Sequence, residues 1–100
     1  MAQEQISIRQ QGSVNIGRPR KYIVIFHNDD FTTMDFVVKV LKEVFFKSEV
    51  EAISIMMDVH KKGAGEVGSY PYDLALTKKD RAIEMAREEG FPLRITIQPI

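Results

Sequence analysis

Residues 22–45 read YIVIFHNDDFTTMDFVVKVLKEVF and change character twice along their length. The first five are apolar, β-branched or aromatic at consecutive positions, which is typical of a central strand with at least one covered face. An acidic loop follows. Apolar residues then recur at steps of three and four, which predicts an amphipathic helix through Met34, Val37, Val38, Leu41, Val44 and Phe45. Thr32 or Thr33 is the expected N-cap, and Thr32 with Asp35 resembles a capping box.

The rest of the chain supplies two more helices and two more strands. Ser48 and Glu51 have the spacing of a capping box, which predicts a second helix that ends at Gly63. The remaining elements are expected over residues 66–70 (strand), 73–89 (helix) and 93–97 (strand). The order β-α-α-β-α-β predicts an α+β domain in which a small three-stranded antiparallel sheet carries three helices packed on one face.

Composition separates residues 1–20 from a folded domain expected over residues 21–100. The first twenty positions are rich in Gln, Gly, Ser and Asn and have only scattered apolar residues, so we expect a flexible N-terminal extension. The whole chain is 44% hydrophobic and 28% charged, which is ordinary for a globular protein. One domain of this size can bury a small hydrophobic core.

Charge and cysteine content exclude several classes of function. Lys plus Arg and Asp plus Glu each number 14, and this balance argues against binding to nucleic acid or anionic membrane through bulk charge. The chain has no cysteine, which excludes disulfides, thiolate catalysis and cysteine-ligated metals. No secretory signal pattern and no apolar stretch of transmembrane length is present, so we expect no membrane partner.

The acidic loop places acceptor groups between the first strand and the first helix. If extended geometry continues past residue 26, Asn28 and Asp30 point to one side and Asp29 to the other. His60 lies four residues after Met56 on the second predicted helix, so the two share a face. Turn chemistry would also explain the loop, and a partly buried histidine bonded to a backbone carbonyl would also explain His60.

Three functions are compatible with these residues. A metal-dependent or acid–base enzyme would use Asp29, Asp30 and His60, but no metal-ligand spacing, nucleophile, phosphate loop or cofactor fingerprint accompanies them. A binding module would hold a cation with the same acceptors beside an apolar cavity. The side chains expected to form that cavity are Met34, Val37, Met56 and Leu93. The binding module requires the fewest groups that the sequence lacks.

Four separated blocks resemble the ClpS family, the bacterial adaptors of the Clp AAA+ protease. They are NDDFTTMDFV at 28–37, MMDVHKKG at 56–63, YDLALTK at 72–78 and FPL at 91–93, and the similarity extends over about residues 21–98. The resemblance implies a fold similar to the C-terminal domain of the ribosomal stalk protein. It also implies a non-enzymatic, cytoplasmic, monomeric adaptor without a cofactor. Such adaptors bind N-degron substrates that begin with Phe, Leu, Tyr or Trp and deliver them to the ClpA unfoldase for degradation by ClpP.

The resemblance also implies roles for individual residues. Asn28, Asp30 and His60 would bind the substrate's α-amino group, and Asp29 would assist at the pocket mouth. The side chains implied to line the hydrophobic pocket are Thr32, Met34, Val37, Met56, Val59 and Leu93. The residues implied to dock on the unfoldase N-domain are Asp73, Thr77 and Lys78. The extension over residues 1–20 would engage the unfoldase during handover.

Three positions depart from the family pattern. Thr33 stands where proline is common, Phe31 where tyrosine is usual and His27 where an aliphatic residue is typical. We expect a less rigid loop from Thr33 and the loss of a hydroxyl group at Phe31. The position of His27 near Asp29 suggests added pH sensitivity. No departure removes an expected ligand of the amine.

Overall fold

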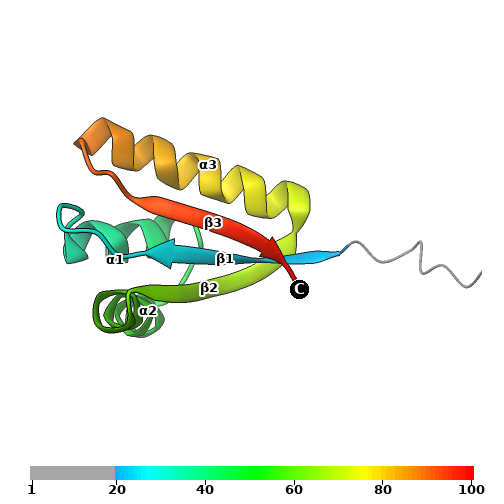
Figure 1. Ribbon diagram of the computed structural model, residues 1–100, viewed down its shortest axis with the longest axis horizontal. Helices are drawn as coiled ribbons and strands as arrows, with labels where there is room; N and C mark the ends of the chain where they lie inside the picture. The colour runs from blue at the N-terminus through cyan, green and yellow to red at the C-terminus, as the bar shows by residue number, and fades with distance from the viewer. Residues whose placement is uncertain (1–19) are drawn as a thin grey trace, which may run out of the picture.

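The computed structural model describes residues 20–100, and Figure 1 shows their course. The elements are β1 (Lys21–His27), α1 (Met34–Glu43), α2 (Glu49–Lys62), β2 (Ala64–Pro71), α3 (Tyr72–Glu89) and β3 (Arg94–Pro99). This order is the one expected from the sequence. The expected N-terminal extension lies outside the described residues except for Arg20. Among residues 20–100, none of the helices combines the length and apolar character needed to cross a membrane.

The sheet has β1 at its centre, with β2 and β3 antiparallel on either side. Val24 and Phe26 of β1 are fully buried, whereas Ile23 and Ile25 on the opposite face are half-buried. The prediction of a central strand is therefore confirmed. Because β1 runs from Lys21 to His27, the acidic loop leaves the sheet from its middle strand and passes directly to α1.

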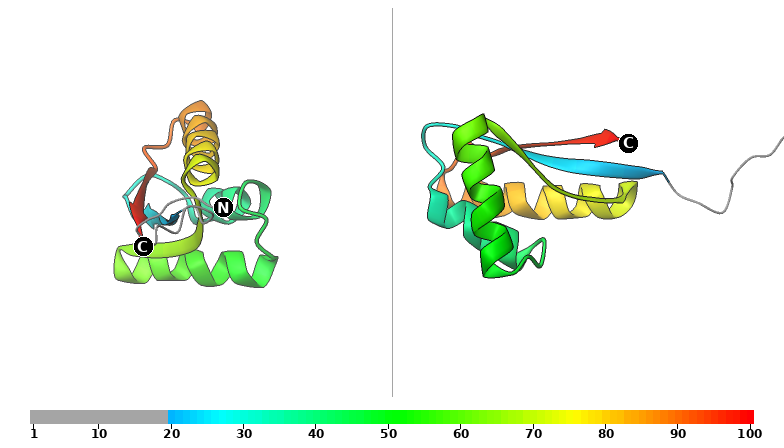
Figure 2. Two further views of the ribbon diagram at one scale, coloured as in Figure 1. Left: turned by 90° about the vertical axis from the view of Figure 1, so that its right-hand side faces the viewer. Right: turned by 90° about the horizontal axis from the view of Figure 1, so that it is seen from below.

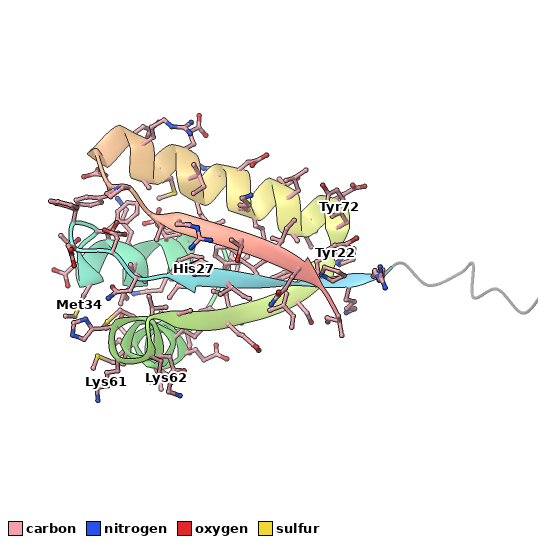
Figure 3. All side chains as sticks on the ribbon, in the orientation of Figure 1. Tyr22, His27, Met34, Lys61, Lys62 and Tyr72 are labelled. Atoms are coloured by element: carbon pink, nitrogen blue, oxygen red, sulfur yellow. The ribbon has the colours of Figure 1, made fainter. Side chains whose placement is uncertain are left out.

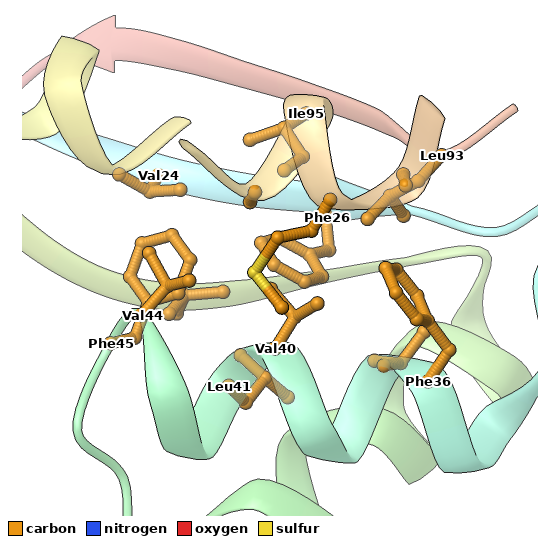
Figure 4. Close-up of a cluster of buried hydrophobic side chains, with 14 of the residues drawn as sticks. Val24, Phe26, Phe36, Val40, Leu41, Val44, Phe45, Leu93 and Ile95 are labelled. Carbon is orange, nitrogen blue, oxygen red and sulfur yellow. The ribbon is translucent and has the colours of Figure 1, made fainter. Parts of the chain in front are cut away.

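All three helices cover one face of the sheet, as the end-on view of Figure 2 shows. α3 packs along all three strands, while α2 packs against β2 and α1. The core fills the space between them, where Val24, Phe26 and Ile95 from the sheet lie near Val40 and Leu41 of α1 (Figure 4). The antiparallel α+β architecture is therefore confirmed.

The N-terminus of α1 is capped by Thr33. Its hydroxyl oxygen accepts a hydrogen bond of 3.2 Å from the backbone N–H of Phe36. The hydroxyl of Thr32 instead donates to the carboxylate of Asp29. The expected capping box of Thr32 and Asp35 is therefore wrong, because the first threonine is used inside the loop and the second begins the helix.

The ends of α2 follow the sequence signals closely. Ser48 and Glu51 form a reciprocal capping box, and Gly63 ends the helix with a φ of 89°, a conformation that glycine adopts without strain. β2 begins at Ala64, earlier than expected, and includes Pro71 at its end. The glycines in this segment weaken the sequence signal for a strand. The segment nevertheless forms a full strand, because it pairs with the whole length of β1.

Candidate functional site

A cavity of about 390 Å³ opens where the chain leaves β1. It lies between the loop, the first turn of α1 and the last turns of α2. Its lining residues are Asn28, Asp29, Asp30, Phe31, Thr32, Thr33, Met34, Val37, Met56, Val59 and His60. Figure 3 shows Met34 at this end of the molecule, near the end of α2 that carries Lys61 and Lys62. One cavity thus brings together residues from both sequence blocks that were expected to form a site.

Backbone hydrogen bonds explain how these distant residues meet. The N–H of Asn28 donates to the carbonyl oxygen of Gly63 over 2.9 Å, which ties the loop to the C-terminal end of α2. The N–H of Gly63 in turn donates to the carbonyl oxygen of Val59. His60 lies in this last helical turn. The connection therefore holds Asn28 and His60 at the same opening although they are far apart in sequence.

Asp29 organises the loop. Its Oδ1 accepts hydrogen bonds from the backbone N–H groups of Phe31 and Thr32 at 2.8 and 2.7 Å, and its Oδ2 accepts from the Thr32 hydroxyl. Partial burial raises the pKa of Asp29, but these hydrogen bonds outweigh that effect, so the pKa lies below its ordinary value. The carboxylate is consequently ionised and turned toward its own loop.

The remaining polar side chains at the cavity are free to face a ligand. Asn28, Asp30 and His60 are exposed to solvent and line the opening. They can offer an amide oxygen, a carboxylate and an imidazole nitrogen. Within residues 20–100, no group of three histidine, cysteine or acidic side chains is arranged to hold a metal ion. The acceptors at the opening are therefore two oxygen-bearing side chains and one imidazole from separate segments of the chain.

The interior of the cavity is apolar. Val37 and Val59 are almost fully buried and form part of the core, and Met56 packs against it. Met34 stands at the rim with 44% of its surface exposed. Thr32, which is half-buried, also lines the cavity. Of the six pocket residues that were expected, five therefore line the cavity: Thr32, Met34, Val37, Met56 and Val59.

Leu93 does not belong to the cavity lining. It is 6% exposed and lies in the hydrophobic core, close to Phe26 and Ile95 in Figure 4. Its expected role in the pocket stays a prediction. Phe31 and Thr33, which were not among the expected pocket residues, do line the cavity. Their position in the loop between Asp29 and Met34 is the signal that could have identified them.

His27 is separate from the site. Its Nε2 lies 2.8 Å from the hydroxyl oxygen of Thr96, across the pair of strands β1 and β3. Burial, together with the positive charge of Arg94, lowers its pKa. Any pH sensitivity from His27 would therefore act through the sheet, in contrast to the direct effect on Asp29 that we expected.

Lys78 occupies a partly buried position on α3. Its Nζ donates to the carbonyl oxygen of Val44 over 2.8 Å and lies 4.6 Å from the ring centroid of Phe46 and 5.5 Å from that of Tyr70. Burial lowers its pKa. The ammonium group thus joins α3 to the end of α1 through hydrogen bonding and cation–π contact. Thr77 donates its hydroxyl to the carbonyl oxygen of Asp73, and both residues are exposed.

Comparison with known proteins gives consistent matches. Residues 17–96 match the model of the family described as "ATP-dependent Clp protease adaptor protein ClpS". A protein of that name from Lawsonia intracellularis is 46% identical, over 93% of this chain and 91% of its own length. Its counterpart from Acetivibrio thermocellus is 45% identical, over 96% and 97%. The structure of Agrobacterium tumefaciens ClpS2 bound to L-phenylalaninamide has a TM-score of 0.80 and 41% identity, covering 83% of this chain and all of that one.

Proposed function

This chain belongs to the ClpS family of ATP-dependent Clp protease adaptors, and from that premise we propose that it selects substrates by their first residue. The family consists of adaptors and not of enzymes. The substrates are proteins with a free α-amino group on an N-terminal Phe, Leu, Tyr or Trp, delivered to a ClpA-type unfoldase for degradation by ClpP. The observation that supports this most directly is a single cavity with polar acceptors at its mouth and an apolar interior.

The polar mouth fits an α-ammonium group. An α-amine has a reference pKa of about 7.7–8.0, so near neutral pH it is mostly a cation with three N–H donors. Asn28, Asp30 and a neutral His60 provide one acceptor for each donor. An internal Phe has only an uncharged amide N–H, and it would leave acceptors without partners. This mismatch would discriminate between a free N-terminus and the interior of a chain.

The apolar interior fits the first side chain of the substrate. Val37 and Val59 provide buried surface, and Met34 and Met56 provide flexible walls. Burial of a Phe side chain removes about 150–250 Å² from water, which corresponds to an upper limit of roughly 4–6 kcal/mol. L-Phenylalaninamide, the ligand of the Agrobacterium protein, carries both groups in question, a free amine and a benzyl side chain.

Delivery would use surfaces away from the cavity. We assign docking on the unfoldase N-domain to the start of α3, with Asp73, Thr77 and Lys78, and engagement of the unfoldase to residues 1–20. Lys78 also bonds to Val44, so its substitution would disturb the fold as well as docking. Exposed Asp73 is therefore the better position for a docking test. The family's protease partner supports a cytoplasmic location, and a monomer would suffice for this role.

Peptide titration tests the amine site. Labelled peptides would begin with Phe, with N-acetyl-Phe or with Ile, and anisotropy would report binding. We expect acetylation to weaken binding by about tenfold to a hundredfold. This range corresponds to the loss of about one or two charge-assisted hydrogen bonds. Asp30→Ala should weaken the Phe peptide by at least about tenfold. The matched control is Asp80→Ala, an exposed acid on α3, which should bind like the unmodified protein. Equal affinity for free and acetylated peptides would overturn the proposal.

A further inference from the structure

A second hollow of about 530 Å³ lies between α1 and α2. We call it the α1–α2 groove. Its lining residues are Asp35, Val38, Lys39, Lys42, Glu43, Glu49, Ile53 and Met56. Met56 lines both this groove and the cavity described above. The two hollows therefore share one methionine side chain. They also adjoin at the start of α1, where Met34 lines the cavity and the next residue, Asp35, lines the groove.

The groove is lined by three apolar and five charged side chains. Val38 and Met56 are partly buried and pack against the hydrophobic core. Ile53 keeps 42% of its surface exposed. Lys42 of α1 forms an ion pair with Glu49 of α2, which links the two helices across the groove lining. An isoleucine left exposed in a hollow that is also lined by charged groups is the arrangement expected for a site that accepts an apolar group.

We propose that the α1–α2 groove binds the substrate residues that follow the first one and takes an apolar side chain from the second or third position. This inference rests on the proposed function, because the cavity would hold the first residue and a protein substrate must continue outward. An extended chain advances about 3.3 Å per residue, so its next residues stay close to the cavity rim. Met56 lines both the cavity and the groove, so the groove is the hollow that adjoins the cavity on the α2 side.

Ile53 is the residue that tests this extended site. It lies outside the cavity lining, and it contributes exposed apolar surface to the groove. Val50 offers a matched control, because it is an apolar residue on the same helix, 79% exposed and outside both hollows. Alanine at either position preserves helix propensity. Circular dichroism and thermal unfolding would verify that Ile53→Ala and Val50→Ala remain folded.

Three ligands would be titrated against the unmodified protein and both variants. They are L-phenylalaninamide, peptides with Leu at position two or three after Phe, and the same peptides with Ser in place of Leu. We expect the better Leu peptide to bind about fivefold more tightly than its Ser counterpart, because part of a Leu side chain is buried. Ile53→Ala should remove most of this preference, and Val50→Ala should keep it. L-Phenylalaninamide has no second residue, so its affinity should be the same for all three proteins.

Each result separates the groove from the amine site. Equal binding of Leu and Ser peptides to the unmodified protein would overturn the inference, and so would an unchanged preference in Ile53→Ala. The inference would also be overturned if Ile53→Ala weakened L-phenylalaninamide as much as it weakened the Leu peptide, since the residue would then act on the cavity itself. Failure of the unmodified protein to bind L-phenylalaninamide would refute the amine site. It would also refute the proposed role of the α1–α2 groove, which rests on that site.

Discussion

At the scale of single residues, two adjacent carboxylates have different environments. Asp29 accepts hydrogen bonds from Phe31 and from both the backbone and hydroxyl of Thr32, whereas Asp30 is exposed at the cavity. The first carboxylate satisfies N–H groups that an irregular loop would otherwise leave unpaired. It fixes the turn that orients the second one. Asp29 therefore supports the loop, and its expected role at the pocket mouth stays a prediction.

Met34 is the residue that we expect to select the first side chain. It is 44% exposed at the cavity rim, directly after the N-cap of α1, so its side chain can form a wall without being fixed in the core. Met34→Ala should remove that wall and admit β-branched residues. We predict that peptides beginning with Ile or Val gain at least about fivefold in affinity relative to those beginning with Phe, as the loss of a steric clash allows. An unchanged ranking of first residues in titrations of Met34→Ala would contradict this role.

At the scale of elements, the position of α2 decides the shape of the site. The helix contributes Met56, Val59 and His60, and it packs closely against β2 at Gly65. A Cβ atom at Gly65 would lie 2.9 Å from Cγ2 of Val59 and 3.3 Å from the carbonyl oxygen of Ile55. The absence of a side chain at this position lets the helix lie close enough to the sheet for the cavity to form.

Gly65→Ala should therefore move α2 and weaken the site. We predict a loss of about 1–3 kcal/mol in the free energy of unfolding, typical of overpacking, together with weaker binding of L-phenylalaninamide. Ser69→Ala serves as the control, since it lies exposed on the same strand and should change neither quantity by much. Urea unfolding and calorimetric titration would measure the two effects. Normal binding by Gly65→Ala would show that this contact does not position the helix.

The sequence predicted the elements better than it predicted their side-chain contacts. The capping box at Ser48 and the stop at Gly63 are local signals, and both are confirmed. The cap of α1 was ambiguous because Thr32 and Thr33 have the same chemistry, and only the carboxylate of Asp29 decides which one caps the helix. Leu93 was assigned to the pocket by resemblance, but it lies two residues before Ile95. Strand alternation places both on the same, core-facing side.

At the scale of the whole molecule, the architecture and the location of the site could be predicted, but its exact walls could not. The order of elements and the apolar central strand were sufficient for the antiparallel sheet with helices on one face. The cavity depends on the bond from Asn28 to Gly63, which joins segments far apart in the chain. The α1–α2 groove depends on how two helices pack, which periodicity alone does not specify.

The stability of the whole domain should depend on pH through His27. Burial first, and then the charge of Arg94, lower its pKa in the folded protein below the ordinary value of 6.5. Below about pH 6.5 the unfolded chain therefore binds a proton more readily than the folded one, and the free energy of unfolding falls as pH decreases. This decline continues until the folded-state histidine is also protonated. The neutral ring is the form that the sheet accommodates beside Thr96.

His27→Gln should reduce this pH dependence, because glutamine can keep a hydrogen bond to Thr96 but does not titrate. Urea unfolding at pH 7.5 and at pH 5.5 would give the free energy of unfolding for both proteins. We predict a smaller decrease between the two pH values in the variant than in the unmodified chain. The loop carboxylate Asp29, whose pKa is also lowered, stabilises the fold above about pH 4 and loses this effect only as pH falls further. A decrease of the same size in His27→Gln would assign the pH dependence to groups other than His27.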